Sequence, residues 1–428
     1  MTRIPMNRLL IFVSAFCISV LLISGFVSCK KEKKDESVTL TFTSWRTDDV
    51  DQMDRINALY TKAHPNIHIK FQPYPTETYD SISHDRYAKG IGADLIFLRP
   101  YEVGRKFYDQ SYLYDLSNTI PNLSSFSPVV VHAWSTDQGI TYGLPSVGVT
   151  HGIYYQKAIF DKYGLSEPTN WTEFMAVCQT LKQGGENVIA QGVTDSWTMY
   201  EVVFSGLGAN FYGGEPARQG LMAGTMKLTD DNFLAAFAMV NSLKPFLAPG
   251  YETKSYEEMR QLFGSGNAAM FIGGSWEISV FNNLGATSDK IGWFAPPVAV
   301  TGANLQYCFH VDGGIGVNKN SKNLSAALEY LKWLSGSEYA QALMSELPGF
   351  FSYTPGSYAI SNPLAKEMYD ASAGANLTVR TMCEKLSAQE PAGNTLMGTA
   401  LNGMMLGTYT PATAAAYVQS QLDTWYHP

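Results

Sequence analysis

Residues 38–44 read VTLTFTS and residues 95–98 read LIFL, and these two stretches decide the fold that we expect. In the first stretch Val38, Leu40 and Phe42 alternate with threonines, the period-two pattern of a strand with one buried face. The second stretch is a short, continuously apolar run, which is typical of a strand buried on both faces of a parallel sheet.

The residues between these two stretches complete an α/β pattern. Apolar residues recur at helical spacing over 50–60, and acidic residues crowd the start of that helix, where its dipole favours negative charge. Residues 67–71 alternate again as a strand, and a second helix is expected over 78–89. The order strand–helix–strand–helix–strand predicts parallel strands joined by right-handed crossovers.

The carboxyl ends of these three strands carry a distinctive mixture of side chains. In such sheets ligands bind beyond the carboxyl ends of the strands, which here lead into 44–48, 73–77 and 99–102. An indole, a phenol, guanidinium groups and carboxylates together suit a sugar, because aromatic faces cover its C–H face and planar groups take its hydroxyls in pairs. Ordinary packing of Trp45 and Tyr101 is the alternative.

A glycine-rich stretch at 264–269 resembles a dinucleotide-binding fingerprint in its letters only. An apolar strand over 268–272 follows these glycines, whereas the fingerprint needs a strand before and a helix after. We therefore interpret the stretch as a turn into a strand that ends at Trp276. The small residues before Trp276 would let a ligand ring approach and stack on its indole, and a core tryptophan is the alternative.

The start of the chain predicts export. Basic residues precede an apolar run over 9–27, and a small residue stands before Cys29, as in a secretory signal with a lipobox. We predict a signal peptide over 1–28, lipidation of Cys29 and a charged tether over 29–36. Phe26 stands where lipoboxes prefer Leu, and the apolar run is long enough to span a bilayer, so an uncleaved anchor is the alternative.

The composition excludes some classes of protein. The chain has 428 residues, enough for two domains, and 45% of them are hydrophobic. A net charge of −8 and the lack of a basic stripe argue against nucleic-acid binding. Cys178, Cys308 and Cys383 form no CxxC motif, so we expect buried free thiols and no metal cluster, although one disulfide stays possible.

Several further segments carry a resemblance to a known family. In order along the chain they are 142–145 (YGLP), 154–157 (YYQK), 168–174 (PTNWTEF), 263–270 (FGSGNAAM), 274–276 (GSW), 313–317 (GGIGV) and 407–417. From about residue 38 to its end, the chain resembles the family 1 extracellular solute-binding proteins, which are maltose-binding-protein-like components of carbohydrate ABC importers. Gln156 departs from the usual Tyr-Asn-Lys, and 357–405 matches least.

The resemblance implies an α/β fold of two doubly wound lobes joined by a hinge, a periplasmic binding protein-like fold of class II type. The hinge crossings are expected near 144–149, 310–314 and 347–353. The expected boundaries are 37–146 and 312–346 for the N-terminal lobe, and 147–311 and 347–428 for the C-terminal lobe.

The resemblance also implies a function and a site. The protein would bind a mono- or oligosaccharide outside the cytoplasm and deliver it to ABC importer permease subunits, as a lipid-anchored monomer without cofactor, metal or catalytic residue. The family's cleft positions fall on Trp45, Asp48, Arg99, Tyr101, Trp197, Trp276, His310 and Asp312.

Other functions remain open at this point. A non-sugar solute such as a peptide, a polyamine or an iron complex would use the same fold; a dense ring of carboxylates would favour a polyamine, and paired cleft tyrosines would favour iron. An exported glycosidase needs two carboxyl groups across a cleft, for which Glu77 and Glu102 are candidates. No HExxH or GxSxG motif is present, and an adhesive surface lipoprotein is a further alternative.

Overall fold

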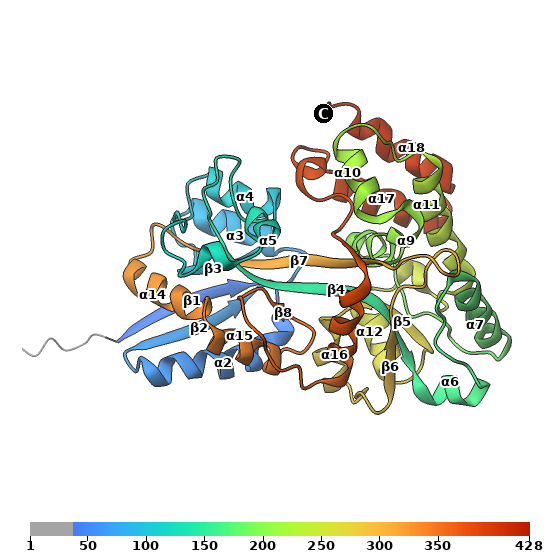
Figure 1. The fold of residues 1–428 in the computed structure, drawn as a ribbon, viewed down its shortest axis with the longest axis horizontal. Helices are drawn as coiled ribbons and strands as arrows, with labels where there is room; N and C mark the ends of the chain where they lie inside the picture. The colour runs from blue at the N-terminus through green and yellow to red at the C-terminus, as the bar shows by residue number, and fades with distance from the viewer. Residues whose placement is uncertain (1–36) are drawn as a thin grey trace, which may run out of the picture. The chain divides into compact units, whose positions relative to one another are not determined.

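The first three strands form one end of a nine-stranded sheet in the computed structural model (Figure 1). Strand β1 (Val38–Ser44) lies between β2 (Ile67–Pro73) and β3 (Leu95–Leu98), and it pairs with β3 in parallel. Helices α2 (Val50–Ala63) and α3 (Tyr79–Ala88) connect them. The predicted strand–helix order of this part of the chain is confirmed.

The structure describes residues 37–428. The predicted signal peptide, the lipidation site Cys29 and the charged tether lie outside the described residues. Within residues 37–428, no helix is both long and apolar enough to cross a membrane.

Two long strands run through both halves of the sheet. Strands β4 (Leu144–Gln156) and β7 (Gln306–Val317) pair antiparallel with each other over one part of their length. On its other edge β7 pairs with β3 in the first half, and the end of β4 pairs with β5 (Met270–Gly274) and β6 (Ile291–Phe294) in the second. The fold is therefore the predicted α/β fold with two lobes, and antiparallel strands connect them.

The three segments expected to cross between the lobes lie side by side. The first lies in β4 and the second in β7, and the third contains the short strand β8 (Phe351–Ser352), which pairs with β4 at Val147 and Gly148. Strand β9 (Asn376–Thr378) pairs with β7 in parallel.

Helices cover both halves of this sheet (Figure 1). In the first half these are also α4 (Glu102–Asp109), α5 (Pro128–His132), α14 (Leu324–Leu334) and α15 (Ser337–Glu346). In the second half they are α6 (Lys157–Tyr163), α7 (Trp171–Gln183), the π-helix η4 (Thr198–Phe204), α8 (Ser205–Leu207), α9 (Ala209–Tyr212), α10 (Gly214–Met222), α11 (Asp231–Leu243), α12 (Tyr256–Gly264), α13 (Glu277–Asn283), α16 (Pro363–Ala371), α17 (Gly393–Leu406) and α18 (Pro411–Leu422). Short 3₁₀ turns are η2 (Thr47–Asp49), η3 (Leu123–Ser125), η5 (Lys244–Phe246), η6 (Tyr251–Thr253), η7 (Ser372–Gly374) and η8 (Glu384–Ser387).

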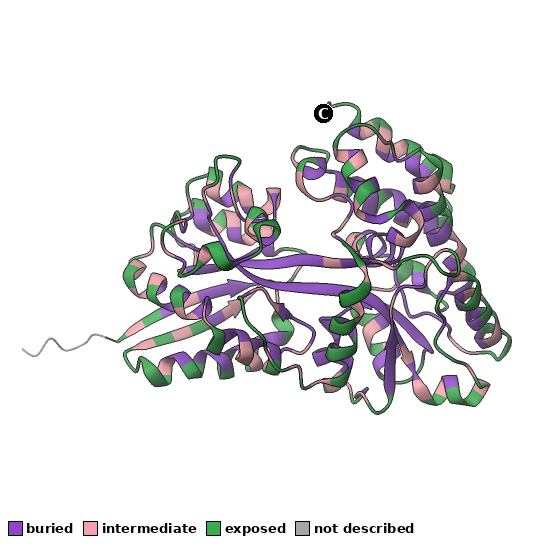
Figure 2. Ribbon diagram, in the orientation of Figure 1, coloured by how far each residue is buried: buried purple, intermediate pink, exposed green. Residues whose placement is uncertain are grey.

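The crossing strands β4 and β7 are buried along almost their whole length (Figure 2). Close packing explains the glycines in β7: a Cβ on Gly314 would lie 2.5 Å from the ring of Trp134, and one on Gly313 would lie 2.2 Å from the ring of Phe97. Real side-chain contacts do not approach so closely, so the GGIGV sequence lets aromatic rings lie directly on the strand.

Candidate ligand-binding cleft

Residues from both halves of the sheet line a cavity of about 650 Å³. This volume is usual for small-molecule sites. One wall comes from the residues that follow β1, β2 and β3, as the parallel topology predicts. The opposite wall comes from η4, α12 and the residues after β5. We call this cavity the cleft. The residues that line it are Trp45–Asp48, Pro75–Glu77, Asp80, Arg99, Val103, Asp195–Trp197, Glu201, Ser255–Glu257, Arg260, Trp276, Glu277, Asp312, Phe350, Arg380, Asn394 and Thr395.

The structure brings all eight residues of the predicted site to this region. Six of them line the cleft, and the other two line a smaller adjoining cavity of about 70 Å³ that shares Arg99, Glu201 and Asp312 with it. The six are Trp45, Asp48, Arg99, Trp197, Trp276 and Asp312, and the two are Tyr101 and His310.

Trp45 is held by packing on several sides. Its ring lies 5.5 Å from that of Tyr79 and 4.9 Å from that of Phe97, and the guanidinium of Arg99 lies 4.5 Å from its centroid. Only 6% of Trp45 is exposed. At the cleft, Trp45 and Arg99 therefore form one stacked pair, and the indole is not presented alone. Cation–π attraction stabilises this pair.

Trp276 is also mostly buried. The small residues before it leave the space that the Trp276 ring itself fills. A Cβ on Gly274 would lie 2.0 Å from the Trp276 ring, and that ring meets His151 edge to face at 5.3 Å. Ser275 bridges two crossings, since its hydroxyl accepts from Thr150 N–H and donates to Gly349 O. The Gly-Ser-Trp sequence thus fixes Trp276 at the edge of the cleft with 7% of its surface exposed.

Three polar atoms on cleft residues are buried without a hydrogen-bond partner among the described residues. They are the indole N–H of Trp197, Nε of Arg380 and Oε2 of Glu277. Buried polar groups are nearly always hydrogen-bonded, so each such exception needs an explanation. Two donors and one acceptor are therefore left unsatisfied on residues that line the cleft.

Glu277 and Arg260 are charged residues of the opposite wall, which η4, α12 and the residues after β5 form. Glu277 is fully buried, and its Oε1 accepts a 2.7 Å hydrogen bond from the hydroxyl of Tyr256. Burial raises the pKa of Glu277, and the nearby Arg260 offsets part of that increase. Arg260 Nη1 lies 3.6 Å from Glu277 Oε2 and 3.1 Å from Asp48 Oδ2, so this guanidinium also contacts the first wall.

The other cleft arginines are paired as well. Arg99 donates to Asp80 at 2.9 Å, and Arg46 donates two hydrogen bonds, of 2.7 and 2.9 Å, to Asp49. Burial lowers the pKa of Arg46, but the Asp49 carboxylate more than offsets this, so its pKa is raised and its charge is kept. These planar groups are oriented before any ligand arrives.

Arg380 joins the cleft to the crossing strands. Its Nη1 lies 3.0 Å from Glu201, and its Nη2 lies 3.7 Å from Asp312 on β7. Its backbone N–H donates to Nδ1 of His310 at 3.5 Å. Burial, followed by the charge of Arg380, lowers the pKa of His310 well below its usual value, so this imidazole is neutral. The ring of His310 thus accepts a hydrogen bond from Arg380, and it lines the smaller adjoining cavity.

Tyr101 has a strained backbone. Its φ of 58° with ψ of −135° is unusual for a residue with a side chain. Hydrogen bonds hold this conformation, since Tyr101 N–H donates to Ala133 O at 2.7 Å and its carbonyl accepts from Tyr142 at 3.3 Å. Such strain is frequent at functional sites.

Sequence reasoning missed several polar cleft residues. The charged groups it did not select are Arg46, Asp80, Asp195, Glu201, Glu257, Arg260, Glu277 and Arg380. Arg46 and Glu277 each follow a residue that was selected, so strand-end position was a usable signal for both. Arg380 lies in the segment that least matches the family, and no local pattern there indicated a site.

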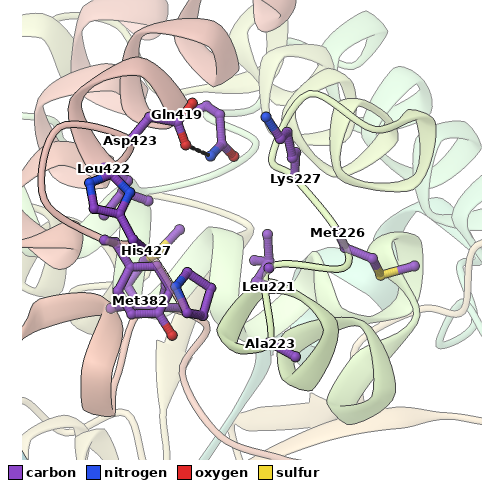
Figure 3. Close-up of a pocket in the computed structure, with 13 residues that line it drawn as sticks. Leu221, Ala223, Met226, Lys227, Met382, Gln419, Leu422, Asp423 and His427 are labelled. Carbon is purple, nitrogen blue, oxygen red and sulfur yellow. Dashed lines mark hydrogen bonds between the residues drawn. The ribbon is translucent and has the colours of Figure 1, made fainter.

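A separate pocket of about 220 Å³ lies between α10 and α18 at the end of the chain (Figure 3). Met226, Lys227 and the final residues His427 and Pro428 line it, and Gln419 donates to Asp423 there at 2.8 Å. None of the eight predicted site residues lines this pocket.

The cysteines do not add a site. All three of the cysteines in residues 37–428 are free thiols; Cys178 and Cys308 are buried as expected, whereas Cys383 is half-buried. Burial raises the pKa of each thiol, which opposes nucleophilic chemistry. No cluster of three metal-ligating side chains occurs in the part of the chain that the structure describes.

The two-lobed α/β fold, with a cleft lined from both halves of the sheet, is the architecture of a solute-binding protein. Residues 44–341 match the profile of the bacterial extracellular solute-binding proteins. The chain belongs to this family, whose members act outside the cytoplasm.

Individual relatives are distant. An ABC transporter extracellular-binding protein of Pyrococcus horikoshii is 26% identical over 279 residues, which cover 62% of this chain and 63% of the relative. The multiple sugar-binding protein of Streptococcus mutans is 23% identical over 334 residues, 76% of this chain and 77% of the relative. A solved chitin oligosaccharide binding protein superposes with a TM-score of 0.77 at 23% identity, covering 91% of this chain and 98% of the other, which shows the shared fold.

Proposed function

We propose that this protein captures a carbohydrate, either a mono- or an oligosaccharide, between its two lobes and delivers it to the permease subunits of an ABC importer. The three unpartnered polar atoms of the cleft carry this proposal. A sugar hydroxyl can accept from Trp197 or Arg380 and donate to Glu277, so one kind of ligand group satisfies all three.

The remaining lining supports the same ligand. Three tryptophans, Trp45, Trp197 and Trp276, share the cleft with oriented arginine–carboxylate pairs. Aromatic faces cover the C–H groups of a sugar ring, and the planar pairs bind its hydroxyls. Sugar binding by the relatives named above supports this choice, since both the multiple sugar-binding protein and the chitin oligosaccharide binding protein are named for saccharides.

We propose that delivery uses a hinge. The lobes would comprise 37–146 with 312–346, and 147–311 with 347–428, and would rotate about the adjoining segments of β4, β7 and β8. Because a ligand shifts an equilibrium only through its differential affinity, the sugar must bind the closed form better than the open form.

We further propose that Cys29 carries a lipid, that residues 29–36 form a solvated tether to a membrane and that the protein acts as a monomer. The basic start, the apolar run and the position of the cysteine in the sequence support the anchor.

We propose binding without catalysis. A glycosidase needs two carboxyl groups on either side of the scissile bond. Glu77 is an exposed residue at the edge of the cleft, and Glu102 lines only the smaller adjoining cavity. The carboxylates deeper in the cleft are held in ion pairs with arginines, where they orient binding groups.

One observation favours a second candidate. Eight carboxylates line the cleft, and a ring of carboxylates is what a polyamine would require. Ion pairs with arginine occupy most of them, however, which leaves few to neutralise a polycation.

Thermal unfolding of residues 37–428 against a panel of saccharides, polyols, polyamines and peptides tests the proposal. At a ligand concentration about a hundred times Kd, one-site binding stabilises the folded state by about 2.7 kcal/mol. We expect a shift with one saccharide class that is abolished in Trp276→Ala. A shift with polyamines or peptides alone would keep the fold and contradict carbohydrate binding, and turnover of a saccharide would contradict binding without catalysis.

A further inference from the structure

We infer that the cleft selects its ligand by charge: it binds uncharged saccharides and their amino-sugar analogues, and it rejects saccharides that carry a carboxylate or phosphate. This inference rests on the proposed function and specifies the class of saccharide.

The ionisable side chains of the cleft are unbalanced. Four arginines and eight carboxylates line it. No lysine or histidine is among the described residues that line it. The arginines are Arg46, Arg99, Arg260 and Arg380; the carboxylates are Asp48, Glu77, Asp80, Asp195, Glu201, Glu257, Glu277 and Asp312.

Each of the four arginines is already paired with a carboxylate. Arg46 is bonded to Asp49, which is 2% exposed and lies behind the cleft wall. Arg99 contacts Asp80 at 2.9 Å, Arg260 contacts Asp48 at 3.1 Å, and Arg380 contacts Glu201 at 3.0 Å. A ligand carboxylate entering the cleft would therefore meet no cation whose charge is uncompensated, and it would have to displace an internal carboxylate to gain one.

Six of the eight lining carboxylates form ion pairs with arginines, and two, Glu77 and Asp195, do not. Glu77 is exposed at the mouth of the cleft and has no ion pair. Asp195 accepts a 2.6 Å hydrogen bond from the N–H of Tyr256, the first residue of α12. Their charge is not neutralised by an arginine, so the field inside the cleft repels an anion and attracts a cation.

Glu277 gives the selection a chemical basis. It is fully buried, and its Oε2 has no hydrogen-bond donor among the described residues. A hydroxyl or an ammonium group can donate to this oxygen, whereas a carboxylate or phosphate dianion has no proton to donate. A carboxylate or phosphate group placed at this oxygen would leave it unsatisfied, and an anionic group elsewhere in the cleft would still add a like charge near Glu277.

Calorimetric titration of residues 37–428 with matched triads tests the inference. The probes are glucose, glucosamine and glucuronate; galactose, galactosamine and galacturonate; and cellobiose, chitobiose without acetyl groups and cellobiouronic acid. In any triad whose neutral member binds, we expect the uronate to bind at least tenfold more weakly and the amine to bind as tightly or more tightly. We also expect 0.5 M NaCl to reduce the difference, because salt screens the part that comes from exposed charge.

A charge reversal at the cleft mouth provides the internal control. Glu77→Lys should strengthen uronate binding severalfold relative to the neutral sugar. Glu329→Lys makes the same change on an exposed residue of α14 outside the cleft, and it should leave the ratio unaltered. Two outcomes would overturn the inference while sugar binding stands. One is equal affinity for a uronate and its neutral partner. The other is the same ratio of uronate affinity to neutral-sugar affinity in Glu77→Lys and in Glu329→Lys. Failure of every saccharide to bind would overturn it together with the proposed function.

Discussion

Asp48 Oδ2 accepts a hydrogen bond from Arg260 Nη1 at 3.1 Å, although the two residues are separated by 212 positions in the sequence. Asp48 lies in η2 directly after β1, and Arg260 lies on α12, which packs near β5. The pair therefore joins the two walls of the cleft. A contact of this kind exists only when the walls are close together, so it favours the closed arrangement.

Asp48→Asn should shift the lobes towards an open arrangement and weaken sugar binding. Arg260 keeps two other carboxylate neighbours, so we expect a loss of about 1 kcal/mol or less, or roughly twofold to fivefold in Kd. Calorimetry measures the affinity, and small-angle scattering measures the change in dimensions on adding sugar. Asp51→Asn, on the exposed first turn of α2, is the matched control. Identical Kd values for the two variants would show that this ion pair does not couple to closure.

Arg260→Met should destabilise the fold by about 3–5 kcal/mol, because it leaves the buried Glu277 carboxylate without its cation. The pKa of Glu277 is already raised by burial and should rise further in this variant. A raised folded-state pKa contributes stability that is present at low pH and is lost as pH rises through it. Urea unfolding should therefore show the largest deficit above neutral pH.

The double variant Arg260→Met with Glu277→Gln checks the reason for this loss. A neutral amide removes the unpaired charge, so most of the stability should return and the pH dependence should disappear. If the double variant were as unstable as Arg260→Met alone, lost packing of the arginine stem would be the cause instead.

We expect the protein to lose stability in mild acid because folding opposes the protonation of His151. Burial, followed by the charge of Arg380, lowers the pKa of this fully buried imidazole to about 3. A lowered folded-state pKa means that stability is present above the unfolded-state pKa of about 6.5 and is lost as pH falls towards 3. Between pH 7 and pH 5 this one group should remove about 2 kcal/mol of unfolding free energy.

Urea unfolding of His151→Gln against His68→Gln isolates that contribution, because every other group titrates in both variants and His68 is exposed. The slope of unfolding free energy with pH should be smaller in His151→Gln than in the control. Equal slopes would mean that folding does not lower the pKa of His151.

Gly274→Ala should reduce both stability and sugar affinity, because the new methyl group would lie 2.0 Å from the Trp276 ring and must displace it. Overpacking of this kind costs about 1–3 kcal/mol. In a Trp276→Ala background the same change should cost far less, since the ring is gone, and this non-additivity is the signature of a direct clash. Thermal unfolding with and without sugar measures both effects, and additive losses would contradict the contact.

Much of the cleft was predictable from local patterns. Alternation in 38–44 and the apolar run at 95–98 identified strands whose ends must share one edge of the sheet. Residues at those ends, such as Trp45 and Arg99, could therefore be placed together from the sequence alone. The lobe boundaries and the hinge motion stay predictions. The set of residues that contact a sugar stays a prediction as well.

The partners of those residues were not predictable in the same way. A local pattern indicates that Trp45 follows a strand, but it does not indicate that Arg99 lies over its ring. Likewise the sequence shows glycine before Trp276, whereas only the packed structure shows that the indole itself fills the space this glycine leaves.

The sequence by itself determined the class of fold, the edge at which the cleft forms and the kinds of side chain presented there, because strand and helix periodicity and strand-end position are local properties of the chain. Tertiary structure alone decided how the charges of the cleft are paired, since Arg260 and Arg380 meet their carboxylates across separations of many residues. Pairing depends on distances of a few ångströms between elements, and no local pattern specifies those distances.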